Sequence, residues 1–177
     1  LGKIEIKGKD ALAFMNLIYT NSFSKMKPGS SRYALMLGED GMVKDDGIIC
    51  KISDEHFIAT TTTGGAATVL GCMEEYAQTE WPNLNVYMNS ITEQYATFNI
   101  SGPKTRNIIE NVFPEVNFSN EAFPFMTFQF HEYEDIPIRI LRASFTGEMG
   151  YEIYVPSNQA LKIWEKIIDF GKEFGLR

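Results

Sequence analysis

The segment from Arg32 to Ile52 constrains the fold more than any other part of the sequence. Two runs rich in apolar residues, 32–37 and 42–52, flank the connection Gly38-Glu39-Asp40-Gly41. Short apolar runs bounded by turn residues are typical of strands, and a short Asp-Gly connection is typical of a hairpin turn. The segment therefore predicts a long β-hairpin, around which the chain must build an antiparallel sheet.

The rest of the chain mixes strand and helix patterns. Strands are predicted for residues 2–7, 56–62, 84–88, 93–100, 136–143 and 151–155. Helices are predicted for residues 11–18, 64–80, 101–112 and 158–174. An aromatic-rich segment beyond Pro114 is predicted to be irregular. Hairpins and single crossovers, rather than strict strand-helix-strand repetition, favour the α+β class with antiparallel sheets and packed helices.

Composition narrows the function classes. With 177 residues and 44% hydrophobic content, the chain can bury a substantial core in one or two domains. Its formal net charge of −7 argues against nucleic-acid binding, which requires a basic face. No apolar run approaches the roughly 20 residues that a membrane span needs. We therefore expect neither nucleic acid nor membrane as a partner.

The cysteines and histidines do not form a recognisable site. Cys50 and Cys72 show no CxxC spacing, which favours a reduced, cytoplasmic compartment. His56 and His131 are the only histidines, and neither has a metal ligand at suitable spacing. A structural zinc site and a histidine-based triad are thus unexpected. Any chemistry must depend on carboxylates, hydroxyls or a bound cofactor.

Two adjacent carboxylates, Asp45 and Asp46, interrupt the second strand of the predicted hairpin. Neighbouring side chains of a strand point to opposite faces, so only one of them can face a given site. Asp46 would share its face with Lys44 and Ile48, unless a bulge at Gly47 alters the alternation. A carboxylate among apolar neighbours can transfer a proton or stabilise a cation. Two solvated acids near a hairpin end are the alternative, and the sequence leaves both open.

The run T-T-T-T-G-G-A-A-T, residues 60–68, precedes a predicted helix. The free N–H groups of a helix N-terminus could bind an anion or a polar ligand. Alternatively, Thr62 or Thr63 caps the helix and the glycines ease its entry. The run lacks the lysine of a Walker motif, which argues against a nucleotide phosphate.

The segment S-F-T-G-E-M-G-Y-E-I-Y, residues 144–154, predicts a tight turn between two strands. Glu152 and Tyr154 share one face of the returning strand. An interior glutamate is costly unless it is paired. The amino-pyrimidinone edge of a pterin would pair it well, because a carboxylate accepts two parallel hydrogen bonds. A glutamate that faces water is the alternative.

Taken together, R-Y-A-L-M-L-G-E-D-G-M-V-K-D-D-G, F-I-A-T-T-T-T-G-G-A-A-T-V and S-F-T-G-E-M-G-Y-E-I resemble the aminomethyltransferase (glycine-cleavage T-protein) superfamily of folate-dependent one-carbon enzymes. Within it, the chain is most similar to the C-terminal half of the alpha subunits of heterotetrameric sarcosine oxidases. Y-T-N-S-F-S-K and Q-T-E-W-P-N-L-N-V-Y strengthen this likeness. The likeness runs in order along nearly the whole chain.

The resemblance implies that the chain binds tetrahydrofolate. The family's catalytic aspartate falls on Asp46, its pterin-binding glutamate on Glu152, and an aromatic residue that packs on the folate on Tyr33. The candidate cofactor-binding residues are Tyr33, Asp45, Thr61, Thr62, Phe145 and Glu152.

Two positions depart from the T-protein pattern. Phe145 stands where the family's Y-T-G-E turn has a tyrosine, and Thr62 stands where the T-protein has the asparagine of a V-N-A segment. Both departures favour the sarcosine oxidase branch, and they argue against the lipoyl-bound substrate of the T-protein.

The resemblance also implies an architecture and partners. We expect two interleaved lobes, residues 1–30 plus 94–177 and residues 31–93. We expect further chain on both sides, an NAD-binding half before Leu1 and a barrel after Arg177. The implied partners are a flavin-containing beta-type subunit and small subunits, so that NAD and flavin bind only to other parts of the complex.

The implied activity is one-carbon transfer. The imine or formaldehyde-level carbon released by sarcosine oxidation would be received on tetrahydrofolate, which yields 5,10-methylenetetrahydrofolate. One alternative is a stand-alone aminomethyltransferase or methyltransferase of the T-protein type. Another is a folate-binding assembly module without turnover.

Overall fold

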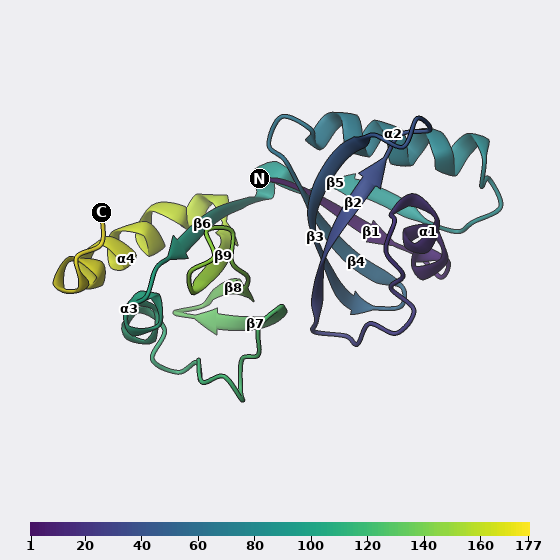
Figure 1. The fold of residues 1–177 in the computed structure, drawn as a ribbon. Coiled ribbons are helices and arrows are strands. Elements are labelled where there is room, and N and C mark those ends of the chain that lie inside the picture. The colour runs from purple at the N-terminus through teal and green to yellow at the C-terminus, as the bar shows by residue number, and fades with distance from the viewer. The chain divides into compact units, whose positions relative to one another are not determined.

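The computed structural model describes all residues 1–177, which divide into two units, Leu1–Thr92 and Glu93–Arg177 (Figure 1). Each unit consists of one antiparallel sheet and two α-helices. This arrangement confirms the predicted α+β class with antiparallel sheets.

The N-terminal unit contains a five-stranded sheet in the order β2-β3-β4-β1-β5. Its elements are β1 (Gly2–Lys7), α1 (Ala11–Ile18), β2 (Ser31–Leu37), β3 (Val43–Ser53), β4 (His56–Thr61), α2 (Ala66–Thr79) and β5 (Tyr87–Ser90). The predicted hairpin is confirmed as β2 and β3, which pair in antiparallel register from Ser31 opposite Cys50. It forms one edge of the sheet, and the candidate acids lie on its inner strand.

Both helices of this unit pack into one core. The spacing of Phe14 and Met15 on α1, and of Val69 and Met73 on α2, places apolar side chains on one helical stripe. These residues form a single buried cluster with sheet residues such as Ile6. Removal of this apolar surface from water stabilises the unit and holds both helices against the sheet.

The C-terminal unit contains a four-stranded sheet in the order β6-β9-β8-β7. Its elements are β6 (Tyr95–Ser101), α3 (Thr105–Val112), β7 (Thr127–Tyr133), β8 (Ile136–Arg142), β9 (Gly150–Pro156) and α4 (Ala160–Phe174), with 3-10 turns at Thr92–Gln94 and Ser157–Gln159. Ile109 of α3 and Ile163 of α4 lie in one buried cluster with Ile140 and Ile153 of the sheet. Helices therefore pack on the face that carries Ile140 and Ile153, and the alternate residues form the other face.

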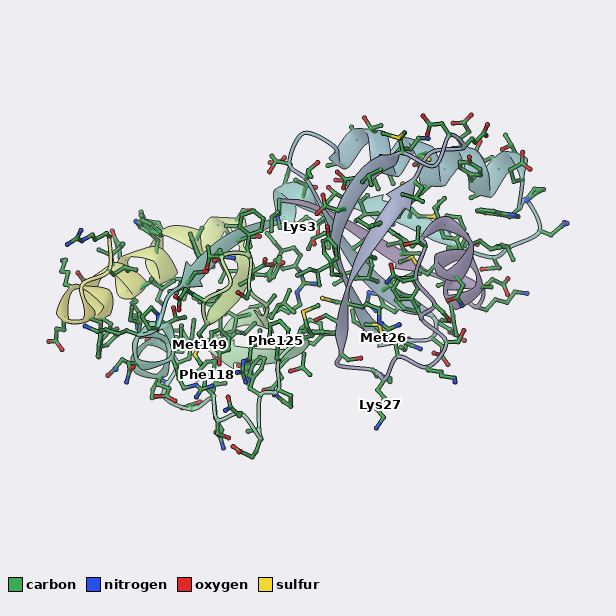
Figure 2. All side chains as sticks on the ribbon, in the orientation of Figure 1. Lys3, Met26, Lys27, Phe118, Phe125 and Met149 are labelled. Atoms are coloured by element: carbon green, nitrogen blue, oxygen red, sulfur yellow. The ribbon has the colours of Figure 1, made fainter.

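The aromatic segment differs from its predicted irregularity, because residues 127–133 form β7. Glu134 and Asp135 make the hairpin turn to β8 with φ of 49° and 62°. Such positive φ values usually call for glycine or asparagine, so the turn carried no strong sequence signal. Phe118 is buried in the core whereas Phe125 is 59% exposed, and both are labelled in Figure 2.

Residues 1–30 also group differently from the expected interleaved lobes. Strand β1 pairs with β4 and β5, so it is an interior strand of the N-terminal sheet. The described units are therefore continuous in sequence, Leu1–Thr92 and Glu93–Arg177. No helix combines the length and the apolar character needed to cross a membrane.

Candidate functional site

Asp46 and Tyr33 contact each other across the hairpin. Leu35 of β2 lies directly opposite Asp46. Tyr33, two residues before Leu35, is therefore the diagonal neighbour of Asp46. The Tyr33 hydroxyl donates a hydrogen bond of 2.9 Å to Oδ2 of Asp46. This bond to a carboxylate raises the pKa of Tyr33, because the neutral phenol is the form that donates. Tyr33 is 53% exposed and Asp46 is half-buried, so a ligand can reach the pair.

Asp45 faces the other way and is buried. Its Oδ1 accepts a hydrogen bond of 2.6 Å from the Thr62 hydroxyl, and its Oδ2 accepts one of 3.1 Å from the Thr62 backbone N–H. The Thr62 Oγ1 in turn accepts from the N–H of Gly65, immediately before α2. A side chain at Gly65 would come within 2.6 Å of Asp45 Oδ1, so this approach requires glycine. Asp45 thus anchors the start of α2.

The strand bulge lies at Lys44 rather than at Gly47. Met36 is opposite Asp45 and Leu37 is opposite Val43, which leaves Lys44 as the extra residue. The bulge directs Lys44 toward α2, where Nζ lies 3.5 Å from Sγ of Cys72. That contact raises the pKa of the Lys44 ammonium.

The threonine run is used largely for local structure. Thr60 Oγ1 accepts a hydrogen bond of 2.8 Å from the Ile48 N–H and donates one of 3.2 Å to the Ile48 carbonyl. Thr61 is buried, and its hydroxyl donates to the Thr62 carbonyl. Between the strands, a Cβ at Gly47 would lie 1.8 Å from the Thr60 carbonyl oxygen. Glycine at position 47 therefore permits this close approach of β3 to β4.

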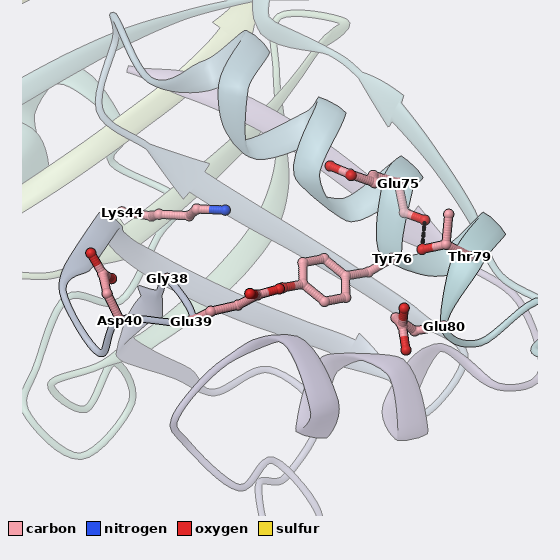
Figure 3. Close-up of a pocket in the computed structure, with 8 residues that line it drawn as sticks. All are labelled: Gly38, Glu39, Asp40, Lys44, Glu75, Tyr76, Thr79 and Glu80. Carbon is pink, nitrogen blue, oxygen red and sulfur yellow. Dashed lines mark hydrogen bonds between the residues drawn. The ribbon is translucent and has the colours of Figure 1, made fainter.

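A separate pocket of about 450 Å³ lies between the hairpin tip and the end of α2 (Figure 3). Lys44 and the Tyr76 ring face it, and the Tyr76 hydroxyl donates to Glu39 Oε1 at 3.3 Å. The other lining residues are Gly38, Asp40, Glu75, Thr79 and Glu80. None of the candidate site residues lines this pocket.

In the C-terminal unit, Glu152 is an interior residue of β9, only 6% exposed. Its Oε2 accepts a hydrogen bond from the hydroxyl of Tyr154, two residues further along the strand. The expectation that these two side chains share a face is therefore confirmed, and the water-facing alternative for Glu152 is wrong. One donor leaves the carboxylate able to accept more hydrogen bonds.

Two neighbours of Glu152 were missed by sequence reasoning. Arg139 is buried on β8 with its guanidinium carbon 4.0 Å from the centroid of the Tyr154 ring. Thr97 lies on β6, opposite Tyr154. Arg139 Nε and Thr97 Oγ1 are both buried without a hydrogen-bond partner. The signal in the sequence was an arginine within the otherwise apolar run Ile138–Leu141.

Phe145 lies in the connection between β8 and β9 and is 92% exposed. Gly147 in the same connection has a φ of 83°, which favours glycine. The candidate residues thus lie in both units. In the N-terminal unit, Tyr33 contacts Asp46, whereas Asp45 contacts Thr62 on the other side of β3, with Thr61 next to Thr62. Phe145 and Glu152 belong to the C-terminal unit.

Comparison with known proteins explains this combination of elements. The sequence matches the family described as the GCVT N-terminal domain over residues 1–177. The chain belongs to this family. Among curated members, it is 47% identical to the sarcosine oxidase subunit alpha of Corynebacterium sp. (strain P-1), over 99% of this chain and 18% of that protein. It is 32% identical to the aminomethyltransferase of Thermoanaerobacter pseudethanolicus, over 100% of this chain and 46% of that protein.

Two solved structures share the fold. The glycine cleavage system aminomethyltransferase T from Bartonella henselae superposes with a TM-score of 0.79 at 23% identity, covering 94% of this chain and 43% of that one. A chain of the heterotetrameric sarcosine oxidase from Corynebacterium sp. U-96 superposes with a TM-score of 0.63 at 12% identity, covering 99% and 82%. The predicted family resemblance is confirmed, and the chain spans 18% of the length of the alpha subunits that it matches.

Proposed function

We propose that this chain is the tetrahydrofolate-dependent one-carbon transfer module of a sarcosine oxidase alpha-type subunit. It would take the imine or formaldehyde-level carbon from sarcosine oxidation and yield 5,10-methylenetetrahydrofolate. The greater identity to sarcosine oxidase alpha subunits than to aminomethyltransferases, 47% against 32%, supports this branch. Flavin and NAD would bind to a beta-type subunit and to other parts of the complex.

The buried carboxylate of Glu152 is the observation that carries the proposal. A glutamate at 6% exposure needs donors, and within the chain it receives one from the Tyr154 hydroxyl. The 2-amino group and N3–H of a pterin are two adjacent donors on a flat edge, which fit the remaining acceptor sites. The residues present therefore suit a pterin.

Asp46 would act as the proton-transferring group. The Tyr33 hydroxyl occupies its Oδ2 and holds the carboxylate in one orientation. The other oxygen can accept a proton from a reacting amine and stabilise positive charge nearby. Tetrahydrofolate, when bound, supplies the nitrogens that accept the carbon. Glu152 would fix the ring, so that part of the acceleration comes from orientation.

The decisive experiment changes Asp46 to Asn in the full protein. The amide keeps the size and the acceptor for Tyr33 but cannot take up the proton. We expect tetrahydrofolate affinity within a few-fold of wild type and loss of methylene transfer, measured by titration and by product assay. Asp40→Asn, an exposed acid on the same hairpin, is the matched control and should retain transfer. Unchanged transfer in Asp46→Asn would remove Asp46 from the role.

A second experiment tests the pterin contact. Glu152→Gln replaces one acceptor oxygen with a donor that opposes the ligand's N–H groups. Tetrahydrofolate affinity should fall by about tenfold or more, as for loss of a charge-assisted pair. An unchanged affinity would contradict binding at Glu152.

A stand-alone aminomethyltransferase of the T-protein type is the second candidate, supported by the 32% identity to such an enzyme. Affinity purification of the full protein from its host separates the two. Co-purification of a flavoprotein with sarcosine-dependent product formation supports the oxidase module. Transfer without any flavoprotein supports the second candidate, and folate binding without turnover in the complete assembly would indicate a non-catalytic module.

A further inference from the structure

A polar row crosses the C-terminal sheet on the face opposite α3 and α4. Thr97 on β6, Tyr154 on β9 and Arg139 on β8 lie directly opposite one another in register. Glu152 is two residues before Tyr154 and is paired with the exposed Asn99. Directly paired residues project from the same face of a sheet, so these side chains form one surface. Asn99, opposite Glu152, is exposed to solvent.

Arg139 is held rigidly on this surface, although its hydrogen bonding is incomplete. The side chain is 6% exposed, and the guanidinium carbon lies 4.0 Å from the Tyr154 ring centroid. Stacking on an aromatic ring fixes the plane of a guanidinium. Nε is nevertheless buried without an acceptor, and no carboxylate lies within ion-pair distance. A buried cationic donor without an acceptor calls for an explanation, and an acceptor on a ligand would provide one.

The phenol of Tyr154 links this donor to Glu152. Its ring lies under Arg139 while its hydroxyl donates to Glu152 Oε2. Arg139 is also the diagonal neighbour of Glu152 across the β8–β9 pair, since Leu141 is directly opposite Glu152. A ligand edge that binds the Glu152 carboxylate would thus lie beside the Arg139 guanidinium.

The amino-pyrimidinone edge of a pterin carries donor, donor and acceptor groups in that order: the 2-amino group, N3–H and the 4-oxo oxygen. We propose that Arg139 donates to the 4-oxo group of a pterin held by Glu152 and so determines specificity for 4-oxo pterins over 4-amino analogues. This inference rests on the proposed function, because it takes Glu152 as the pterin-binding carboxylate. A 4-amino group would place N–H against the N–H groups of Arg139 and leave both unpaired.

The test uses titration of the full chain with three ligands. Tetrahydrofolate reports whether the site binds folate at all. Folic acid and aminopterin differ in the 4-substituent and in the hydrogen at N3, so the ratio of their affinities in wild type reflects both Glu152 and Arg139. The change in this ratio when Arg139 alone is replaced measures the part due to Arg139. Wild type should prefer folic acid by about tenfold or more, and Arg139→Met should reduce this ratio by about fivefold or more. The methionine keeps an unbranched apolar stem but donates nothing.

Two further variants make the result specific. Tyr151→Phe removes a buried hydroxyl without a partner from the opposite face of β9, and it should leave the ratio unchanged. Arg139→Lys keeps the charge but loses the planar donor array, and its ratio should fall between those of wild type and the Met variant. If Arg139→Met does not fold, as judged by circular dichroism, Arg139→Lys alone carries the test.

The outcomes separate this inference from the proposed function. Failure of wild type to bind tetrahydrofolate overturns both. Tetrahydrofolate binding with the same affinity ratio in wild type and the folded Arg139 variants overturns the role of Arg139 and leaves the proposed function standing. A reduced ratio in the Arg139 variants, with Tyr151→Phe unaffected, supports the assignment.

Discussion

Each unit has a threonine with a buried hydroxyl on a strand of its sheet, and the two hydroxyls differ in hydrogen bonding. In the N-terminal unit, the buried Thr60 hydroxyl both accepts from and donates to the backbone of Ile48. In the C-terminal unit, the Thr97 hydroxyl is buried with no partner. Of the five buried side-chain atoms that lack a partner, four belong to the C-terminal unit: Thr97 Oγ1, Arg106 Nε, Arg139 Nε and Tyr151 Oη. The exception, in the N-terminal unit, is Ser31 Oγ.

This difference separates polar groups that stabilise the fold from polar groups that do not. Polar groups with internal partners add to stability, whereas buried groups without them reduce it. Proteins often retain such costly groups at functional sites. The N-terminal unit therefore holds its acids by internal hydrogen bonds. On the C-terminal sheet, Thr97 Oγ1 and Arg139 Nε lack a partner on the face that carries Glu152.

Thr60→Val should have the largest effect on stability. The valine has the shape of threonine but leaves the Ile48 N–H without its acceptor, which should lower the free energy of unfolding of the N-terminal unit by about 2 kcal/mol. Native-state hydrogen exchange, which reports on each unit separately, measures the change. An effect near zero would mean that water replaces the hydroxyl and that the Thr60 bonds contribute little.

Thr97→Val is the same substitution in the other unit and should act in the opposite direction. It removes a buried hydroxyl that has no partner, so the free energy of unfolding of the C-terminal unit should rise by about 1 kcal/mol. The same exchange experiment tests it. Destabilisation by Thr97→Val would show that its hydroxyl has a partner in solution, and the contrast between the units would then fail.

The sequence predicted the N-terminal group of residues better than the C-terminal one, for a physical reason. Apolar-rich runs around the Asp-Gly turn defined β2 and β3, and the two-residue period of a strand separated Asp45 from Asp46. Alternation also placed Glu152 beside Tyr154. It could not reveal Arg139, because that residue meets Tyr154 only through the register of β8 with β9, which local pattern does not encode.

The bulge at Lys44 shows the same limit. Sequence reasoning allowed for a bulge at Gly47, since glycine often marks one, but the glycine there serves the close approach to Thr60. The positions of bulges and of β1 within the sheet depend on pairing between distant segments. Local propensity carries no information about such pairing.

Tyr33→Phe tests the internal hydrogen bond of Asp46 in the N-terminal unit. The hydrogen bond to Asp46 raises the pKa of Tyr33 above its ordinary value of 10.0. Because the folded pKa is raised, the bond is present below pH 10 and is lost as the pH rises through the higher folded value. An ultraviolet titration of phenolate should show that the variant lacks one late-titrating tyrosine.

Asp46→Asn is the control for this titration. It removes the charge that favours the neutral phenol, so the pKa of Tyr33 should move back toward 10.0. Identical titrations of wild type and Asp46→Asn would mean that the two side chains do not interact in solution.

Glu134→Gln should have the smallest effect. It tests whether an exposed ion pair in the C-terminal unit contributes to stability. Hydrogen bonds from Lys162 and Lys166 lower the pKa of Glu134 from 4.5 to about 2. A lowered folded pKa adds stability above pH 4.5 that is lost as the pH falls toward 2. Acid unfolding of the variant should therefore depend less steeply on pH within this window.

Glu132→Gln, which changes an exposed acid on β7 outside any ion pair, serves as control. Equal slopes for both variants would show that solvent screens the Glu134 pair, as it does for many surface ion pairs.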